Sequence, residues 1–483
     1  MKEQTIRGAF WTLVDAAGGQ LFSLLAFLVL ARLLDPSDYG VIALSLSILA
    51  IPSVLLNEGF GDSLIQRDDL RDSHINAAFW ANLSLAAIFV VAAEASAGLL
   101  ANLTGEPLVE PTMRWLAPCL IATAVTSIAM NIYRRRFNYS TAALRTFVAT
   151  ASGALVGVGL AALGFGVWSL VASQIVQQIV GLLVMWVGLG WRPQISFSVA
   201  AFMDLCHFSA RVMVGNAVRF GTEKLDSVII GASLGPILLG YYYMAQRLLT
   251  TVNFVTISLA DNVMLPALSR MQNDETRLAQ TFISMIVAAA MLWVPFVAGL
   301  GLITPHLVPL FFSHKWDPAV PVIMIVCITA VTQVLSRTTS QALLAIGRPT
   351  VNALLNLIQF AIMLVLFSIG VRFGIEGAAW AYTGMSAAIV PFHLWALHRF
   401  VKVPVGQLLL EYAPVVGAGL IMSGAVAVTG QALSPSMGDW CLIGQIPIGG
   451  FVYVAALYCF APRRVKEVAS LVSHLLPAKF RFV

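Results

Sequence analysis

Residues 282–304 read FISMIVAAAMLWVPFVAGLGLIT, a run of 23 residues without a charged side chain. A helix needs about 20 such residues to cross the hydrocarbon core of a membrane, because each residue advances about 1.5 Å along the axis. Similar runs recur along the whole chain, in which 59% of the 483 residues are hydrophobic and 11% are charged. Soluble domains carry roughly 25% charged residues. The sequence therefore predicts an all-α, polytopic integral membrane protein.

Fourteen membrane spans fit along the chain, and the links between them are short. The spans cover residues 9–32, 39–57, 77–101, 114–133, 142–163, 166–190, 206–232, 238–262, 282–304, 319–346, 350–371, 376–398, 411–430 and 441–460. No link is long enough to hold an extramembrane domain. The sequence also lacks the G-x-x-x-x-G-K-[ST] motif that an ATP-driven pump needs for its phosphates. We therefore expect no nucleotide-binding domain and no cofactor.

The basic residues predict the orientation of the chain. Eighteen of the 28 Lys and Arg residues fall in segments on the N-terminal side of the membrane, and seven fall within spans. The three on the opposite side are Arg32, Lys315 and Arg372. Because cytoplasmic loops carry the excess of Lys and Arg, both termini are predicted to be cytoplasmic.

A short repeat indicates two related halves. Residues 34–40, LDPSDYG, align with residues 234–240, LGPILLG, at an offset of 200 residues, and each copy joins the first and second spans of a half. A looser match pairs GVW at 166–168 with GAAW at 377–380. Six spans in each half give both halves the same in–out sense. This pattern is typical of parallel repeats related by an axis along the membrane normal.

The repeat predicts three parts of the chain. Residues 1–195 form an N-terminal six-helix lobe, and residues 196–405 form a second, pseudo-symmetric six-helix lobe. Residues 406–483 add two further membrane helices and a basic cytoplasmic tail. We expect the two lobes to face each other across a path for the substrate.

Several motifs, taken in order along the chain, resemble those of Wzx-type polysaccharide flippases. These flippases are the polysaccharide transporters of the multidrug/oligosaccharidyl-lipid/polysaccharide (MOP) exporter superfamily. The motifs are RGAFW at 7–11, ARLLDPSDYG at 31–40, GFGDSLIQR at 59–67, AFW at 78–80, RRRF at 134–137, GFGVW at 164–168, PALSR at 266–270, KW at 315–316 and AIGRP at 345–349. The resemblance covers roughly residues 5–430.

This resemblance implies two bundles of six helices around a V-shaped cavity, in the inner membrane of a bacterium. It implies alternating access, in which an undecaprenyl-diphosphate-linked repeat unit moves from the cytoplasmic to the periplasmic leaflet. The implied partners are the lipid-linked oligosaccharide, membrane lipid, and the polymerase and co-polymerase proteins of polysaccharide assembly, with no nucleic acid.

Charged residues inside spans are candidates for function, because a charge at mid-bilayer costs about 2.5–3.5 kcal/mol even on lenient insertion scales. In the span 206–232, Arg211, Arg219 and Asp226 lie on one helical face, with Glu223 and Lys224 beside it. By helix rise, Arg211 lies about 8 Å and Arg219 about 20 Å from the cytoplasmic end. Arginine suits a diphosphate because its planar fork of donors matches phosphate oxygens. The alternative is that these charges only neutralise one another between helices.

Three further residues complete the candidate set. Arg337 is flanked by the hydroxyl residues of the stretch 336–340, SRTTS, which favours an anion ligand over a link to backbone or lipid headgroups. Arg247 is a weaker candidate of the same kind. Asp15, beside two glycines, is a candidate for pairing with an arginine or binding a coupling cation, with helix packing as the alternative.

Other notable residues have structural interpretations. The run Tyr241-Tyr242-Tyr243 begins a span, where a belt of interfacial aromatic residues is expected. The five cysteines lie in or beside apolar runs without C-x-x-C spacing, and the histidines lack partners at ligand spacing. We therefore expect no disulfide framework, no metal site and no catalytic residues.

The best interpretation is a transporter, not an enzyme, that flips lipid-linked oligosaccharides. One alternative is an ion-coupled multidrug antiporter of the same superfamily, although the excess of arginine over acidic residues within spans favours an anionic substrate. A flippase for the peptidoglycan precursor is a second alternative. A polysaccharide polymerase or ligase is disfavoured, because such enzymes have a sizeable periplasmic loop and none of the predicted outer loops is of that size.

Overall fold

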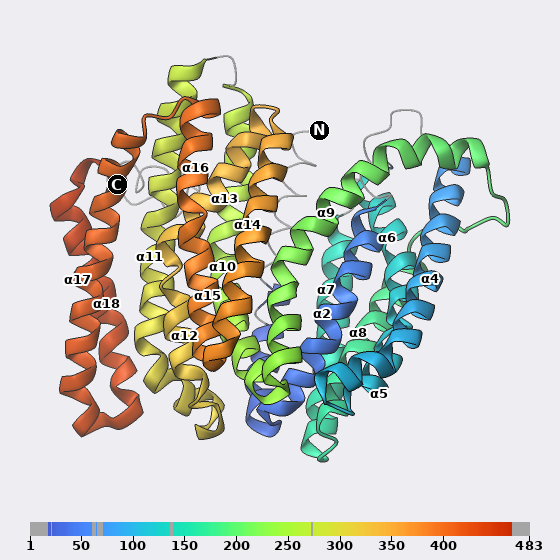
Figure 1. Ribbon diagram of the computed structural model, residues 1–483, viewed down its shortest axis with the longest axis horizontal. Coiled ribbons are helices and arrows are strands. Elements are labelled where there is room, and N and C mark those ends of the chain that lie inside the picture. Colours follow the sequence, from blue (N-terminus) through green and yellow to red (C-terminus); the bar gives the residue numbers. More distant parts are fainter. Residues whose placement is uncertain are drawn as a thin grey trace. The chain divides into compact units, whose positions relative to one another are not determined.

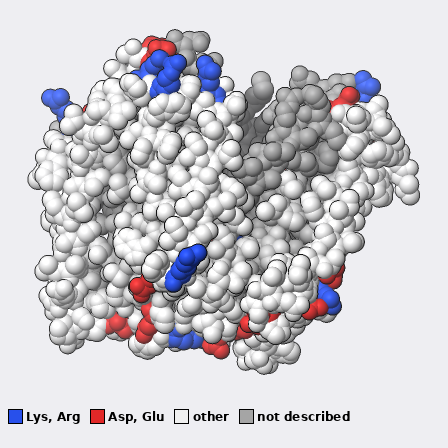
Figure 2. Space-filling model, viewed as in Figure 1, with Lys and Arg blue, Asp and Glu red and all other residues white. Residues whose placement is uncertain are grey.

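The computed structural model describes residues 18–20, 22–59, 64, 71–135, 139–271 and 274–465. Every regular element in these ranges is a helix, which confirms the predicted all-α class. Within the described residues, eight helical segments are long and apolar enough to cross a membrane, or nine if a bent pair counts as one span. Figure 2 shows charged side chains gathered at two opposite edges of one face, with almost none in the band between them. The chain is a multi-pass membrane protein.

The number of spans depends on the way in which the long helical segments are divided. The segments Pro349–Val401 and Val405–Phe460 each contain two of the predicted spans. The first predicted span, 9–32, lies partly outside the described residues, and its described part belongs to a shorter apolar helix, Gly18–Leu33. The total of fourteen stays a prediction.

The chain divides into two compact units, Met1–Tyr243 and Met244–Val483. Unit 1 contains α2 (Pro36–Glu58), α4 (Asp72–Thr104), α5 (Val109–Leu116), α6 (Cys119–Arg135), α7 (Tyr139–Ala162), α8 (Val167–Val187) and α9 (Val199–Leu234). Helix α10 (Pro236–Ser269) begins in unit 1 and continues in unit 2. Helices α7 and α8 lie side by side as a hairpin (Figure 1), and α6 packs against α2, α4 and α8.

A single buried amide connects three helices of unit 1. Asn82 on α4 has no exposed surface. Its Nδ2 donates to the carbonyl oxygens of Leu56 on α2 at 3.0 Å and of Ala124 on α6 at 3.1 Å, and to Ser127 Oγ on α6 at 3.0 Å. Because lipid offers no hydrogen-bond partners, such bonds between helices fix their relative register.

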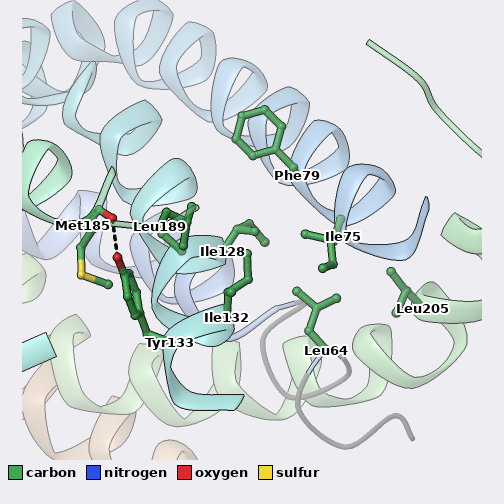
Figure 3. Close-up of a cluster of buried hydrophobic side chains, with 11 residues drawn as sticks. Leu64, Ile75, Phe79, Ile128, Ile132, Tyr133, Met185, Leu189 and Leu205 are labelled. Atoms are coloured by element: carbon green, nitrogen blue, oxygen red, sulfur yellow. Dashed lines mark hydrogen bonds between the residues drawn. The ribbon is translucent and has the colours of Figure 1, made fainter. Parts of the chain in front are cut away.

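Unit 1 contains a cluster of buried apolar side chains (Figure 3). The labelled members are Leu64, Ile75, Phe79, Ile128, Ile132, Tyr133, Met185, Leu189 and Leu205. Tyr133 OH donates to the carbonyl oxygen of Met185 at 3.2 Å. Beside the cluster, Trp80 Nε1 donates to the Gln194 carbonyl oxygen at 2.8 Å, and the Gln194 amide donates to Asn76 Oδ1 at 3.1 Å. The link between α8 and α9 is therefore attached to α4.

Unit 2 contains the remaining helices. They are α11 (Glu275–Phe312), η1 (His314–Trp316), α12 (Ala319–Cys327), α13 (Ala330–Ala345), α14 (Pro349–Gly370), η2 (Val371–Phe373), α15 (Gly374–Ala388), α16 (Val390–Ala396), η3 (Leu397–Val401), α17 (Val405–Met437), η4 (Gly438–Cys441) and α18 (Leu442–Phe460). Helix α11 packs against α12, α13, α17 and α18. The two predicted additional spans, α17 and α18, form a hairpin (Figure 1).

Polar bonds attach this hairpin to the rest of unit 2. Tyr453 OH on α18 donates to the Met291 carbonyl oxygen on α11 at 3.0 Å. Arg464, just after α18, donates from Nε to Glu411 Oε2 on α17 and from a terminal nitrogen to Ser284 Oγ on α11, both at 2.9 Å. The additional helices are therefore an integral part of unit 2. The predicted lobes 1–195 and 196–405 remain a proposal about symmetry.

The Asn82 bonds generate a prediction about stability. We expect Asn82→Ala to lower the free energy of unfolding by about 1–2 kcal/mol, because it removes three bonds between helices in an apolar interior. The measurement is denaturant or thermal unfolding of the purified protein in detergent. Asn102→Ala is the matched control, since Asn102 is an exposed residue of the same helix. Equal stability of the two variants would contradict this role of Asn82.

Candidate functional site

Helix α9 carries six charged residues, more than a membrane helix usually tolerates without a partner or a ligand. Two of these residues have described side chains that bear on the predicted site. Lys224 is exposed, and Asp226 is buried with 6% of its surface accessible. The side chains of Arg211, Arg219 and Glu223 lie outside those that the structure describes, and so does Asp15.

Asp226 is the only buried carboxylate among the described residues. Tyr242 OH, on the first turns of α10, donates to Asp226 Oδ2 at 2.8 Å. The backbone amide and the hydroxyl of Ser227 donate to Asp226 Oδ1 at 2.6 and 3.2 Å. Three donors compensate for the burial of this carboxylate. The bond from Tyr242 also connects α9 to the start of α10.

The aromatic-belt interpretation is wrong for Tyr242. Its side chain is fully buried and its hydroxyl is bound to Asp226, so it packs inside the protein and does not face lipid as a residue of the belt would. Tyr243 stacks on Tyr39 of α2, with ring centroids 6.1 Å apart and 29° between the ring planes. A buried tyrosine needs a partner for its hydroxyl, and no sequence pattern indicated that an acid sixteen residues earlier supplies it.

The predicted span 319–346 is a broken helix. Helices α12 and α13 meet at an angle of 52°. A polar network lies beside the break: Gln333 Nε2 donates to Thr329 Oγ1 at 3.0 Å and to Tyr382 OH at 3.2 Å, and Thr332 shares a short hydrogen bond with Ser386. Broken helices are tolerated in membranes where they are buried in protein or line a cavity.

Arg337 lies on α13, two turns beyond this break, and its side chain is exposed. Two of the flanking hydroxyls do not accompany it, because Thr338 and Thr339 are buried and donate to the backbone carbonyls of Val334 and Leu335. Helical spacing instead places Gln333 and Gln341, four residues before and after, on the face of Arg337. On this face, a guanidinium lies between two amides. The spacing of four residues could have revealed this pattern in the sequence.

Arg247 lies on α10 and is half-buried. Its neighbours Leu248 and Leu249 are buried, so Arg247 belongs to the less buried face of the helix. It lies in unit 2, whereas Lys224 and Asp226 lie in unit 1. The candidate residues are therefore distributed over both units.

Unit 1 also contains a small pocket that the sequence did not indicate. It lies between α2, α6 and α8, and its polar lining consists of Ser53, Cys119, Thr123, Gln174 and Gln178. The rest of the lining is leucine. Its amides, hydroxyls and thiol suit hydroxyl groups or water, and not an anion. Among the described residues, no group of three His, Cys, Asp or Glu side chains is placed to hold a metal ion.

The model of a family described as polysaccharide biosynthesis protein matches residues 29–321. The chain is 26% identical to the succinoglycan biosynthesis transport protein ExoT of Rhizobium meliloti, over 66% of this chain and 64% of that protein. The match therefore spans just under two thirds of that relative. The chain is 21% identical to the lipopolysaccharide biosynthesis protein WzxC of Escherichia coli, over 77% of this chain and 76% of that protein. It is 20% identical to the teichuronic acid biosynthesis protein TuaB of Bacillus subtilis over 98% of both.

Solved structures share the fold. The lipid II flippase MurJ, in an inward closed conformation, matches 95% of this chain and all of that chain with a TM-score of 0.76 and 13% identity. A multidrug resistance MATE family transporter of the MOP superfamily, in an inward-facing conformation, matches 79% of this chain and 95% of that chain with a TM-score of 0.67 and 16% identity. At these identities the likeness concerns the fold alone. Since the family model covers more than half of the sequence, the chain belongs to the polysaccharide biosynthesis protein family.

Proposed function

We propose that the chain is a flippase that moves undecaprenyl-diphosphate-linked oligosaccharide repeat units from the cytoplasmic to the periplasmic leaflet of a bacterial inner membrane. The repeat units would supply assembly of a capsule, an O-antigen or an exopolysaccharide. One combination carries the proposal: a chain of the polysaccharide biosynthesis family has the fold of a lipid flippase and bears cationic side chains on its membrane helices. The proposed activity is transport, without a chemical step.

The names of the curated relatives support the substrate class. They refer to succinoglycan transport, lipopolysaccharide biosynthesis and teichuronic acid biosynthesis, all of which concern cell-surface or secreted polysaccharides. A repeat unit attached to a lipid diphosphate is anionic, large and rich in hydroxyl groups. Its transporter needs cations for the diphosphate and neutral hydrogen-bonding groups for the sugars.

The charged residues of α9, α10 and α13 are the proposed contacts for the diphosphate and its first sugar. They are Arg211, Arg219, Lys224, Arg247 and Arg337. The exposed guanidinium of Arg337 is flanked on its face by amides that suit sugar hydroxyls. By helix rise, it lies about 14 Å from the cytoplasmic end of the predicted span 319–346. Asp15, Glu223 and Asp226 are proposed to balance these cations or to bind a coupling ion.

Two other functions are less well supported. A drug antiporter of the same superfamily shares the fold, but the family and the curated relatives are those of polysaccharide biosynthesis. A peptidoglycan-precursor flippase shares the fold more fully, yet at 13% identity. Repeat units of a surface polysaccharide therefore remain the favoured cargo.

The proposed mechanism is alternating access of two six-helix lobes, 1–195 and 196–405, with both termini in the cytoplasm. The asymmetry of Lys and Arg residues between the two sides of the membrane supports this orientation. Polysaccharide polymerase and co-polymerase proteins are the proposed partners, because they consume repeat units on the periplasmic side.

Deleting the gene in its own host tests the proposed function. We expect one surface polysaccharide to disappear while its diphosphate-linked repeat unit accumulates, because the repeat unit is made but not exported. The measurement is mass spectrometry of extracted lipids, together with analysis of secreted polysaccharide. Restoration of the gene on a plasmid is the control. Normal polysaccharide and lipid pools with increased drug sensitivity would instead support the antiporter.

Arg337 provides a test of the proposed substrate site. We expect Arg337→Ala to reduce export by tenfold or more, since a lost charge-assisted hydrogen bond weakens binding by about 1.5–3 kcal/mol. Arg337→Lys should retain part of the activity, because it keeps the charge without the planar fork. Arg348→Ala is the matched control, at an exposed arginine in the turn between α13 and α14. Export is measured in the deletion strain at equal protein abundance, and wild-type export by Arg337→Ala would remove this residue from the site.

A further inference from the structure

The two copies of the sequence repeat contact each other. Helix α2 begins at Pro36 and helix α10 begins at Pro236, and each carries a glycine four residues later, Gly40 and Gly240. A Cβ atom added to Gly40 would overlap the carbonyl oxygen of Pro236 and lie 2.8 Å from its Cα atom. A Cβ atom added to Gly240 would overlap the carbonyl oxygen of Pro36 and lie 3.2 Å from its Cα atom. All four residues belong to unit 1.

This contact, which we call the glycine crossing, is reciprocal. Each proline contacts the glycine of the other helix, at positions 200 residues apart in the sequence. Reciprocal contacts between equivalent residues arise where a two-fold relation passes through an interface. The two helices meet backbone to backbone, as small residues allow in membranes. A methyl group at either glycine is therefore incompatible with the crossing.

The surroundings of the crossing are aromatic and densely packed. Tyr39, adjacent to Gly40, is 3% exposed. Its ring stacks on Tyr243 and contacts Phe27 edge to face, with ring centroids 5.5 Å apart in the second pair. A Cβ atom at Gly231 of α9 would approach side-chain atoms of Leu44 and Leu239 at 2.8 and 3.0 Å. The crossing thus closes the space between α2, α9 and the start of α10.

The physical character of the crossing suits a contact that forms and separates. At its centre, bare backbone meets bare backbone, so dispersion and weak Cα–H···O contacts hold it. By contrast, separating the helices that Asn82 connects in unit 1, or those that Tyr453 connects in unit 2, would break hydrogen bonds that lipid cannot replace. The crossing lies at the starts of two helices, which the predicted orientation places at the periplasmic surface.

We propose that the glycine crossing is the periplasmic seal of the transport route, and that it separates when the substrate site opens outward. This inference rests on the proposed alternating access and identifies the backbone contact that closes one side of it. It assigns Gly40 and Gly240 one shared role: their lack of a side chain sets the equilibrium between closed and open states.

The test measures access to the crossing from outside. Tyr39→Cys serves as a reporter in a chain without its native cysteines. Its thiol reacts with a membrane-impermeant maleimide that is added to spheroplasts, where the periplasmic face of the intact inner membrane is accessible. Gly40→Ala and Gly240→Ala are each compared with the same reporter. Gly377→Ala is the matched control, because its Cβ atom would overlap the Gly370 carbonyl oxygen in the α14–α15 hairpin, an equally tight contact elsewhere. Gly424→Ala, with open space around its Cβ position, is the neutral control.

We expect either glycine variant to raise the labelling rate about tenfold, the effect of a population shift of ~1.4 kcal/mol toward the open state. The double variant should label no faster than the single ones, because one methyl group already prevents the crossing. Both control variants should label at the reporter's own rate. Since the glycines lie on different helices, a misfolded variant at one position leaves the other position to decide.

Unchanged labelling in a glycine variant of normal abundance would overturn the seal. Lost export with unchanged labelling would do the same, since it would make the crossing a permanent structural contact. The two tests can also disagree. If the glycine variants label faster but deletion of the gene leaves every polysaccharide intact, the seal stands and only the proposed substrate is removed.

Discussion

Lipid offers the backbone no hydrogen-bond partner, and the rest of the structure depends on this constraint. Every amide and carbonyl group at membrane depth must be satisfied within the protein, and helices achieve this within a single segment. The described residues accordingly form helices. Polar side chains inside the bundles are few. Several buried hydroxyls donate to carbonyl oxygens of their own helix, as Thr304 does to Leu300, whereas Asn82 binds across helices, between α4, α2 and α6.

The same constraint separates firm contacts from weak ones. In unit 2, Tyr453 and Arg464 attach the α17–α18 hairpin to α11 through hydrogen bonds that lipid could not replace. In unit 1, the Trp80 and Asn76 bonds attach the link after α8 to α4. The glycine crossing between Gly40 and Gly240 has no such bond at its centre and is held by backbone packing. The proposed transport would need both kinds of contact, because the helix bundles must stay intact while the proposed seal opens.

The sequence predicts much of this fold, since apolar runs and caps are local features. The predicted spans 39–57 and 238–262 correspond to α2 and α10, which begin slightly earlier, at Pro36 and Pro236. The repeat marks both helix starts, but only the structure shows that they contact each other. The 52° break between α12 and α13 has no proline or glycine to announce it. A polar network with α15 lies beside the break, and this is a tertiary feature.

The candidate site was harder to predict than the fold. Arg337 is exposed as a ligand for an anion requires, but its hydroxyl neighbours Thr338 and Thr339 bind their own helix, as threonines in helices commonly do. Asp226 is bound by Tyr242, a partner on the next helix that no spacing rule within one helix reveals. Sequence identifies which residues are too polar for lipid, whereas packing decides which of them face a ligand.

Reconstitution tests the central claim most directly. The purified chain would be placed in liposomes that contain an undecaprenyl-diphosphate-linked oligosaccharide in both leaflets, and a membrane-impermeant glycosidase would be added outside. If the chain is a flippase, the enzyme should reach the whole lipid pool, including molecules that began in the inner leaflet. If cleavage stops at the outer-leaflet fraction, as in liposomes without protein, the chain does not flip this substrate and the account is contradicted.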